Sequence, residues 1–185
     1  MEQIAPTAIT VHDYMAMPQG PPYHQLIDGE LYLSPSPSWK HQDIALNIAT
    51  KIRHYMETDD VGRVFVAPLD VCLTEINVYQ PDVFFFSHSR KKILGERCIE
   101  GAPDFVVEIL SESTAHLDRG HKRKIYARTG VKELWHVDPE LKQVEVFHLK
   151  ESVDAPAATY SDKEKFTSKF FPGLKFSCAE IFRGI

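Results

Sequence analysis

Two carboxylates stand where a buried strand should carry apolar side chains. Asp82 opens an apolar run that continues over residues 83–86, and Glu108 interrupts the run over residues 105–110. Both runs are short and rich in Val, Ile and Phe, as buried strands are. Burying an ionised carboxylate is costly unless a cation or hydrogen bonds compensate the charge. Asp82 and Glu108 are therefore the residues whose presence most needs a chemical reason.

A divalent metal ion is one such reason. The two acids are 26 residues apart, which leaves room for a strand, a connection and a neighbouring strand. Paired carboxylates at the ends of adjacent strands form an oxygen-rich site that suits Mg²⁺ or Mn²⁺. An ion held there can polarise a phosphate and activate a bound water. We therefore expect Asp82 and Glu108 to be metal ligands.

Lys122 is the third candidate catalytic residue. Helical spacing predicts one shared face for Asp118, Lys122, Ile125, Tyr126 and Thr129. The polar start of this face thus carries Asp118 and Lys122. A lysine near a metal ion and a phosphate can stabilise developing negative charge or orient the attacking water.

Simpler interpretations of the same residues stay open. Asp82 can accept hydrogen bonds from loop amides after Pro81, as aspartate often does. Glu108 can form a structural ion pair with Lys122 or Arg128, because ion-pair networks also place carboxylates inside proteins. Most helical lysines extend their charge into solvent, so a catalytic Lys122 competes with that arrangement.

A longer pattern connects these residues. It comprises Gln80-Pro81-Asp82, residues 103–114, Asp118, Lys122, Tyr126 and residues 130–135, with Asp28-Gly29-Glu30, His41 and Val137-Asp138-Pro139 on either side. In this pattern the chain resembles a bacterial family of restriction-endonuclease-like proteins within the PD-(D/E)xK nuclease superfamily. The resemblance covers most of the chain.

The resemblance implies a nuclease that uses Mg²⁺ or Mn²⁺ to hydrolyse phosphodiester bonds. It assigns Asp82 and Glu108 as metal ligands, helped by the Ile109 carbonyl, and Lys122 as the charge-stabilising group. We expect His41, Gln80, Asp118 and Tyr126 to surround them.

Two departures from the family pattern matter. The superfamily lysine usually lies two residues after the second acid, where this chain has Leu110, and the resemblance implies that Lys122 replaces it. Gln25 stands where a glutamate is expected, so no role follows for that position or for the nearby Glu30.

The elements that position these residues are predicted from local patterns. Residues 23–33 read as a hairpin that turns at Asp28-Gly29. Apolar spacing predicts helices over residues 39–57 and 114–128, the second ending at Gly130. Strands are expected at residues 64–66, 69–73, 81–86, 105–110, 133–137 and 144–149. We predict one α/β (α+β) domain over residues 1–185, with its core at about 38–150. A central mixed sheet flanked by helices would carry the N-terminal hairpin and peripheral C-terminal strands.

Composition limits the partners and the location. The net charge of -5 gives no overall basic surface for nucleic acid. No apolar run is long enough to cross a membrane. The cysteines at 72, 98 and 178 are few, odd in number and far apart, which favours a reducing cytoplasm over a disulfide framework.

The expected partner is nucleic acid, with DNA favoured, and we expect a homodimer. Two other functions stay open: a catalytically degenerate module that binds nucleic acid or protein, and a structural protein whose acids and lysine form a buried ion-pair network.

Overall fold

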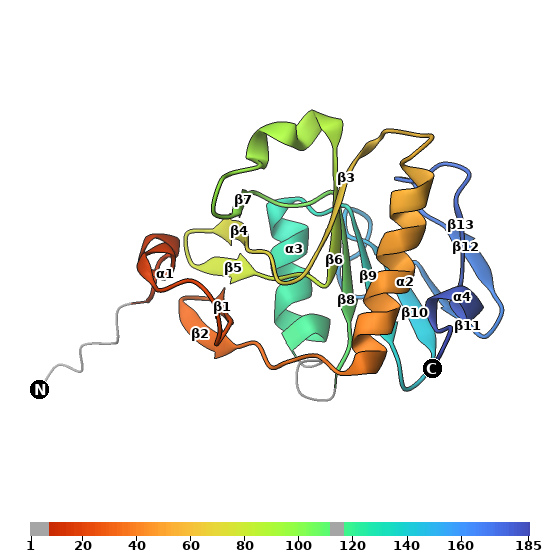
Figure 1. The fold of residues 1–185 in the computed structure, drawn as a ribbon, viewed down its shortest axis with the longest axis horizontal. Coiled ribbons are helices and arrows are strands. Elements are labelled where there is room, and N and C mark those ends of the chain that lie inside the picture. Colours follow the sequence, from red (N-terminus) through yellow and green to blue (C-terminus); the bar gives the residue numbers. More distant parts are fainter. Residues whose placement is uncertain (1–7, 112–116) are drawn as a thin grey trace, which may run out of the picture.

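A six-stranded mixed sheet forms the centre of the protein (Figure 1). The computed structural model describes residues 8–111 and 117–185. The strand order is β11 (Ala158–Ser161), β10 (Gln143–His148), β9 (Glu133–Asp138), β8 (Phe105–Ile109), β6 (Val83–Ser87) and β3 (Gly62–Val66). Strands β8 and β9 run parallel, whereas the other neighbours in this sheet are antiparallel. The predicted central mixed sheet is confirmed.

Helix α2 (Trp39–Tyr55) covers one face of this sheet (Figure 1). Ser38 caps the helix, because its side chain accepts a hydrogen bond from the His41 backbone N–H. The buried stripe of the helix packs on the inward side chains of β6, β8 and β9, among them Phe85, Phe105 and Trp135. The structure thus confirms the helix expected over residues 39–57.

The opposite face of the sheet is covered by α3 (Arg123–Thr129). A π-helical segment, Leu117–Lys122, leads into this helix. Gly130 ends it in the left-handed conformation, with a φ of 104°, as its predicted capping role requires. The expected helix over residues 114–128 is therefore found from residue 117 onward, and residues 114–116 lie outside the described part of the chain.

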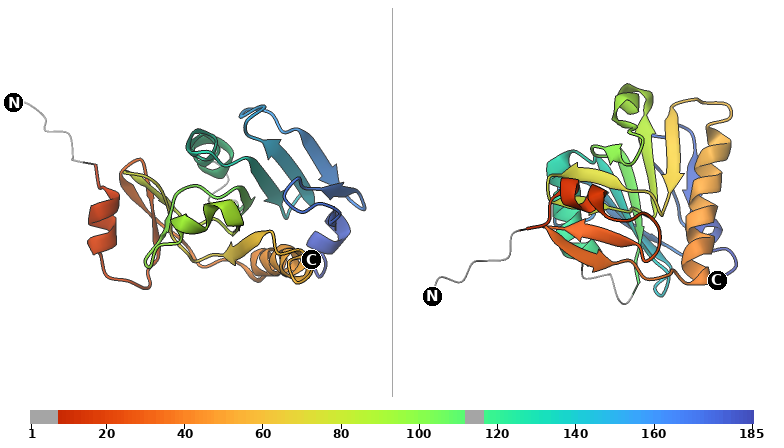
Figure 2. Two further views of the ribbon diagram at one scale, coloured as in Figure 1. Left: turned by 90° about the horizontal axis from the view of Figure 1, so that it is seen from above. Right: turned by 60° about the vertical axis from the view of Figure 1, so that its left-hand side comes forward.

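A second sheet of five strands lies on the α3 side (Figure 2). Its order is β2 (Glu30–Leu33), β1 (His24–Ile27), β5 (Asn77–Tyr79), β4 (Val71–Thr74) and β7 (Ile99–Glu100). The predicted hairpin is present as β1 and β2. It does not stand apart, however, because Leu26 of β1 pairs with Val78 of β5.

The remaining elements are short. They are α1 (Val11–Ala16), a 3₁₀ helix (His88–Ile93), β12 (Lys165–Thr167), β13 (Lys175–Ser177) and α4 (Cys178–Ile181). Strands β12 and β13 confirm the peripheral C-terminal strands expected from the sequence, and α4 is a short helix that follows them. None of the described helices is long and apolar enough to cross a membrane.

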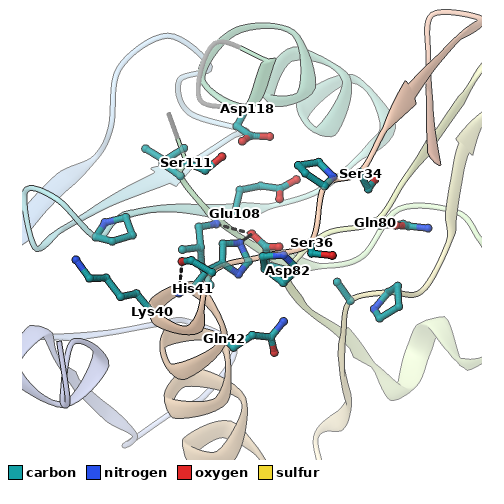
Figure 3. A pocket seen from close by; sticks show the side chains of 18 of the residues that line it. Ser34, Ser36, Lys40, His41, Gln42, Gln80, Asp82, Glu108, Ser111 and Asp118 are labelled. Atoms are coloured by element: carbon teal, nitrogen blue, oxygen red, sulfur yellow. Dashed lines mark hydrogen bonds and ion pairs between the residues drawn. The ribbon is translucent and has the colours of Figure 1, made fainter. Parts of the chain in front are cut away.

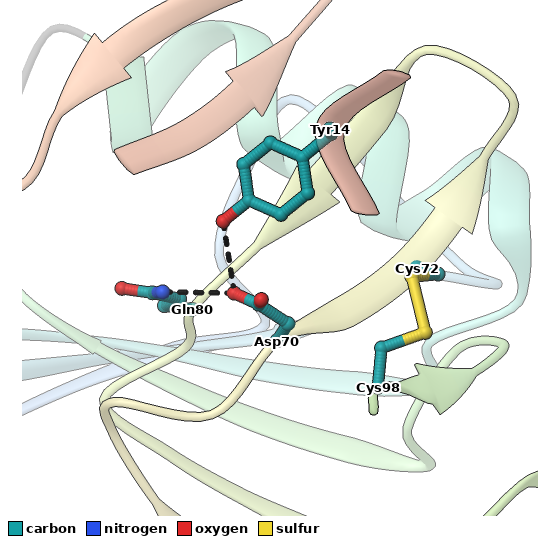
Figure 4. The surroundings of a disulfide bond; sticks show 5 residues. All are labelled: Tyr14, Asp70, Cys72, Gln80 and Cys98. Atoms are coloured by element: carbon teal, nitrogen blue, oxygen red, sulfur yellow. Dashed lines mark hydrogen bonds between the residues drawn. A yellow bond between two sulfur atoms is a disulfide. The ribbon is translucent and has the colours of Figure 1, made fainter. Parts of the chain in front are cut away.

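The cysteine expectation needs correction. Cys72 and Cys98 are joined in a disulfide (Figure 4). Cys178 is a buried free thiol. Their separation of 26 residues is misleading, because Cys72 lies in β4 and Cys98 directly precedes β7, which pairs with β4. The disulfide removes the cysteine-based argument for a reducing environment.

Candidate active site

The register of β6 and β8 brings the two acids together. These strands are antiparallel, with Val83 opposite Val107, so one further step places Asp82 opposite Glu108. The Ile109 backbone N–H donates a hydrogen bond of 2.6 Å to Asp82 Oδ2. The start of β6 and the end of β8 therefore present both carboxylates at one edge of the sheet.

Glu108 points toward α3, as the alternation of its strand predicts. Its side chain is only 3% exposed. Tyr126 donates a hydrogen bond of 2.5 Å from its hydroxyl to Glu108 Oε1. Lys122 Nζ lies 3.3 Å from the same oxygen and 2.9 Å from Asp118 Oδ1. A buried ion-pair network thus exists at this position, and Lys122 is its cation.

The charges in this network do not balance. Burial raises the pKa of Glu108 to about 8; the Lys122 charge opposes this shift, and Asp118 and Asp82 add to it. Burial alone would lower the pKa of Lys122, but the carboxylates of Glu108 and Asp118 raise it above its usual range. The lysine therefore stays charged, and the excess of carboxylates favours binding of a further cation.

His41 contacts Asp82 directly, because its Nε2 lies 3.2 Å from Asp82 Oδ2. Burial lowers the pKa of His41, but the hydrogen bond and charge of Asp82 outweigh this effect and raise it overall. His41 is the third residue of α2 and lies in its first turn. Its backbone N–H donates to the Ser38 side chain, so the cap at Ser38 also helps to hold this contact.

These groups line a cleft of about 570 Å³ (Figure 3). Asp82, Glu108 and Lys122 all reach it, together with His41, Asp118 and Gln80. In Figure 3, Asp118 and Glu108 face the space above Asp82, and His41 approaches Asp82 from the start of α2. The predicted convergence in one cleft is therefore observed, whereas the catalytic roles of these residues stay a prediction.

Gln80 is directed away from the two acids. Its side-chain amide donates a hydrogen bond of 2.8 Å to Asp70 Oδ1, which also accepts one from Tyr14 (Figure 4). Its backbone N–H donates to Gln25 Oε1. Gln25 thus connects β1 to the residue that precedes Pro81. Glu30 is exposed and accepts a hydrogen bond from Tyr32.

Sequence reasoning missed two buried polar residues of the central sheet, Asp104 just before β8 and His136 beside Glu108. Asp104 is fully buried and accepts hydrogen bonds from Lys132 and from the backbone and hydroxyl of Ser87. Its Pro-Asp pair just before a strand repeats Pro81-Asp82, and that repeat was an available signal. His136 pairs opposite Glu108 on β9 and is 1% exposed. The apolar run around His136 gives no signal of this placement.

The donor set fits a hard divalent ion. No group of three or more histidine, cysteine or acidic side chains suited to a metal ion occurs within residues 8–111 and 117–185. Mg²⁺, however, is commonly held by one or two carboxylates, with waters and substrate phosphates completing the shell. Asp82 and Glu108 supply that number, and the surrounding excess of negative charge supports the fit.

Comparison with a solved structure agrees with this fold. A crystal structure described as a putative nuclease belonging to DUF820, from Anabaena variabilis, has a TM-score of 0.79 and 21% sequence identity. The match covers 94% of this chain and 97% of that chain. The mixed α+β fold seen here is therefore the fold of that protein.

The family follows from the sequence comparison. The model of the Uma2 family, described as "Putative restriction endonuclease", matches residues 11–179. This chain belongs to that family. A relative from Synechocystis, described as "Uncharacterized protein slr1290", is 25% identical over 166 residues, which cover 88% of this chain and 84% of the relative.

Proposed function

We propose that this protein is a divalent-metal-dependent nuclease of the PD-(D/E)xK type. The observation that carries the proposal is the convergence of Asp82, Glu108 and Lys122 in one cleft. The family description and the fold of the Anabaena protein support the same reaction class.

In this proposal Asp82 and Glu108 hold Mg²⁺ or Mn²⁺. When bound, the ion would polarise the phosphate and lower the pKa of a coordinated water. The hydrogen bond from Ile109 and the contact with His41 orient Asp82. The Tyr126 hydroxyl orients Glu108 in the same way.

Lys122 supplies positive charge beside the substrate phosphate. Asp118 keeps the ammonium group at the floor of the cleft through their contact of 2.9 Å. A preorganised cation in a site with little water stabilises the negative charge that develops as phosphorus is attacked. Lys122 is thus the residue that replaces the lysine absent at Leu110.

The proposal includes DNA as the nucleic acid, a homodimer as the assembled form and the cytoplasm as the location. The first turn of α2 lines the cleft, and its positive helix end favours a phosphate there. In a cytoplasmic protein the Cys72–Cys98 disulfide would be unusual, so its redox state in cells tests the location directly.

A catalytically degenerate binding module is the second candidate function. The observation that favours it is that Lys122 pairs with both Glu108 and Asp118. These pairs neutralise Lys122, which is the only buried lysine or arginine among the described residues that line the cleft. Such a protein would bind nucleic acid without cleaving it.

Cleavage assays separate these functions. Purified protein is incubated with plasmid, linear DNA and RNA in Mn²⁺, in Mg²⁺ and in a chelator. The nuclease proposal expects metal-dependent products that Asp82→Asn and Glu108→Gln abolish. Glu57→Gln is the matched control, since Glu57 is an exposed acid that pairs with His54 away from the cleft. Metal-independent products, or none on any substrate, contradict the proposal.

A further inference from the structure

The cleft continues into a second hollow. This neighbouring hollow has a volume of about 200 Å³, and it shares Tyr23, Pro68 and Gln80 with the cleft. This hollow is also lined by Arg97, by the end of α1 and by the residues that follow α1. The two hollows therefore form one groove that runs from the carboxylates past Tyr23 to Arg97.

The groove carries too little positive charge to bind many phosphates of a nucleic-acid backbone. Its described basic residues, histidines apart, are Lys40, Arg97 and Lys122. Its described acids are Asp70, Asp82, Glu108, Asp118 and Glu140. Acids therefore outnumber lysines and arginines by two, and one divalent ion would only bring the lining to neutrality. Duplex DNA, in contrast, presents about one negative charge per 1.7 Å of its axis and needs repeated basic contacts.

The walls and floor of the groove favour a ligand with an exposed apolar surface. Pro35, Pro37, Pro68 and Pro139 line the walls, which gives them apolar faces with restricted backbones. At the floor, the Glu108 and Lys122 side chains are 3% and 5% exposed. A phosphate must therefore enter the cleft to reach them, and it must bring its sugar and base with it.

Tyr23 is placed to receive such a base. It lines both hollows and is 42% exposed, although it is a large aromatic side chain. Single-stranded nucleic acids are commonly bound by aromatic rings on which bases stack, with basic groups along the backbone. Arg97, at the far end of the same groove, is an exposed cation for a flanking phosphate.

We infer that this protein takes its nucleic acid as an unpaired single strand, with one base on Tyr23 and the next phosphate toward Arg97. The inference rests on the proposed nuclease function and specifies its substrate. Duplex DNA would be a substrate only at ends or at unpaired stretches, where a strand is free to enter the groove.

A binding experiment tests this inference separately from cleavage. The protein carries Lys122→Met together with Asp118→Asn, which retains Asp82 and Glu108 and prevents the proposed reaction. Neutralising Asp118 limits the loss of stability that Lys122→Met alone would cause, because it removes one of the two buried acids that Lys122 contacts. Fluorescence anisotropy in Mn²⁺ then compares a labelled oligonucleotide as a single strand with the same strand in a fully paired duplex. We expect the single strand to bind at least about tenfold more tightly.

Tyr23 variants in this background test whether the single strand binds in the groove. Tyr23→Ala should weaken single-strand binding by about tenfold, and Tyr23→Phe should preserve it, since stacking needs the ring and not the hydroxyl. Equal or tighter duplex binding, or no effect of Tyr23→Ala, overturns the inference. Absence of binding to either form also overturns it, and the cleavage assay with unmodified protein then decides independently on the nuclease proposal.

Discussion

Replacing Lys122 by methionine should have two separable effects. Methionine keeps an apolar stem of similar length but removes the ammonium group that lies 3.3 Å from Glu108 and 2.9 Å from Asp118. Two carboxyl groups that are each 3% exposed then lose their cation. Removing one partner of a buried pair costs about 3–5 kcal/mol. For a chain of this length, that corresponds to a fall in Tm of roughly 6–20 °C.

The same substitution should lower turnover by about a hundredfold or more, the scale of losing one preorganised charge-stabilising group. A second change distinguishes this loss from simple destabilisation. In Lys122→Met/Asp118→Asn, residue 118 no longer carries a charge, and Glu108 can stay protonated because its pKa is raised, so most of the lost stability should return. Turnover should stay low, because the cation is still missing.

Thermal unfolding and Mn²⁺-dependent cleavage are measured on the wild type and both variants. Mn²⁺ should also raise the Tm of Lys122→Met more than that of the wild type, since the metal supplies the missing positive charge. Cleavage at the wild-type rate by the double variant would refute the assignment of Lys122 and leave it as a structural residue.

The other predictions concern the acids and the disulfide. Asp82→Asn should abolish Mn²⁺ binding in calorimetry while changing apo stability by less than about 1 kcal/mol; a large loss of stability would identify Asp82 as a structural residue. The raised pKa of Glu108, about 8, means that the folded state binds an extra proton between its ordinary value of 4.5 and that pH. Apo stability in urea should therefore fall as pH rises across this window, by at most about 1.4 kcal/mol per pH unit, and Glu108→Gln should flatten the dependence. An unchanged slope would contradict the buried, protonated carboxyl. The double change Cys72→Ser/Cys98→Ser opens a loop of 26 residues and should cost about 3 kcal/mol under non-reducing conditions. A variant as stable as the oxidised wild type would show that the disulfide contributes nothing.

Local patterns predicted the elements that carry the site. The apolar run around Glu108 predicted a buried strand, and in the structure Glu108 lies in β8, where it meets Tyr126 of α3. The apolar stripe of α2 was equally readable. These features depend on the period of side chains along one element, which a sequence displays directly.

Contacts between distant elements were not readable in this way. Strands β5 and β7 contain three and two residues, too few for a periodic signal. The pairing of β4 with β7 brings Cys72 to Cys98, and sequence spacing suggested the opposite. Gln80 lines the cleft but bonds to Asp70, because the five-stranded sheet presents that carboxylate to it. Each difference arises from tertiary pairing and not from local propensity.

Anomalous diffraction from a crystal soaked in Mn²⁺ tests the central claim most directly. The account predicts one strong peak in the cleft, about 2.0–2.6 Å from oxygens of both Asp82 and Glu108. The same peak should be absent from crystals of Asp82→Asn. A manganese ion bound elsewhere, or none at saturating concentration, would contradict a metal-dependent site at these carboxylates.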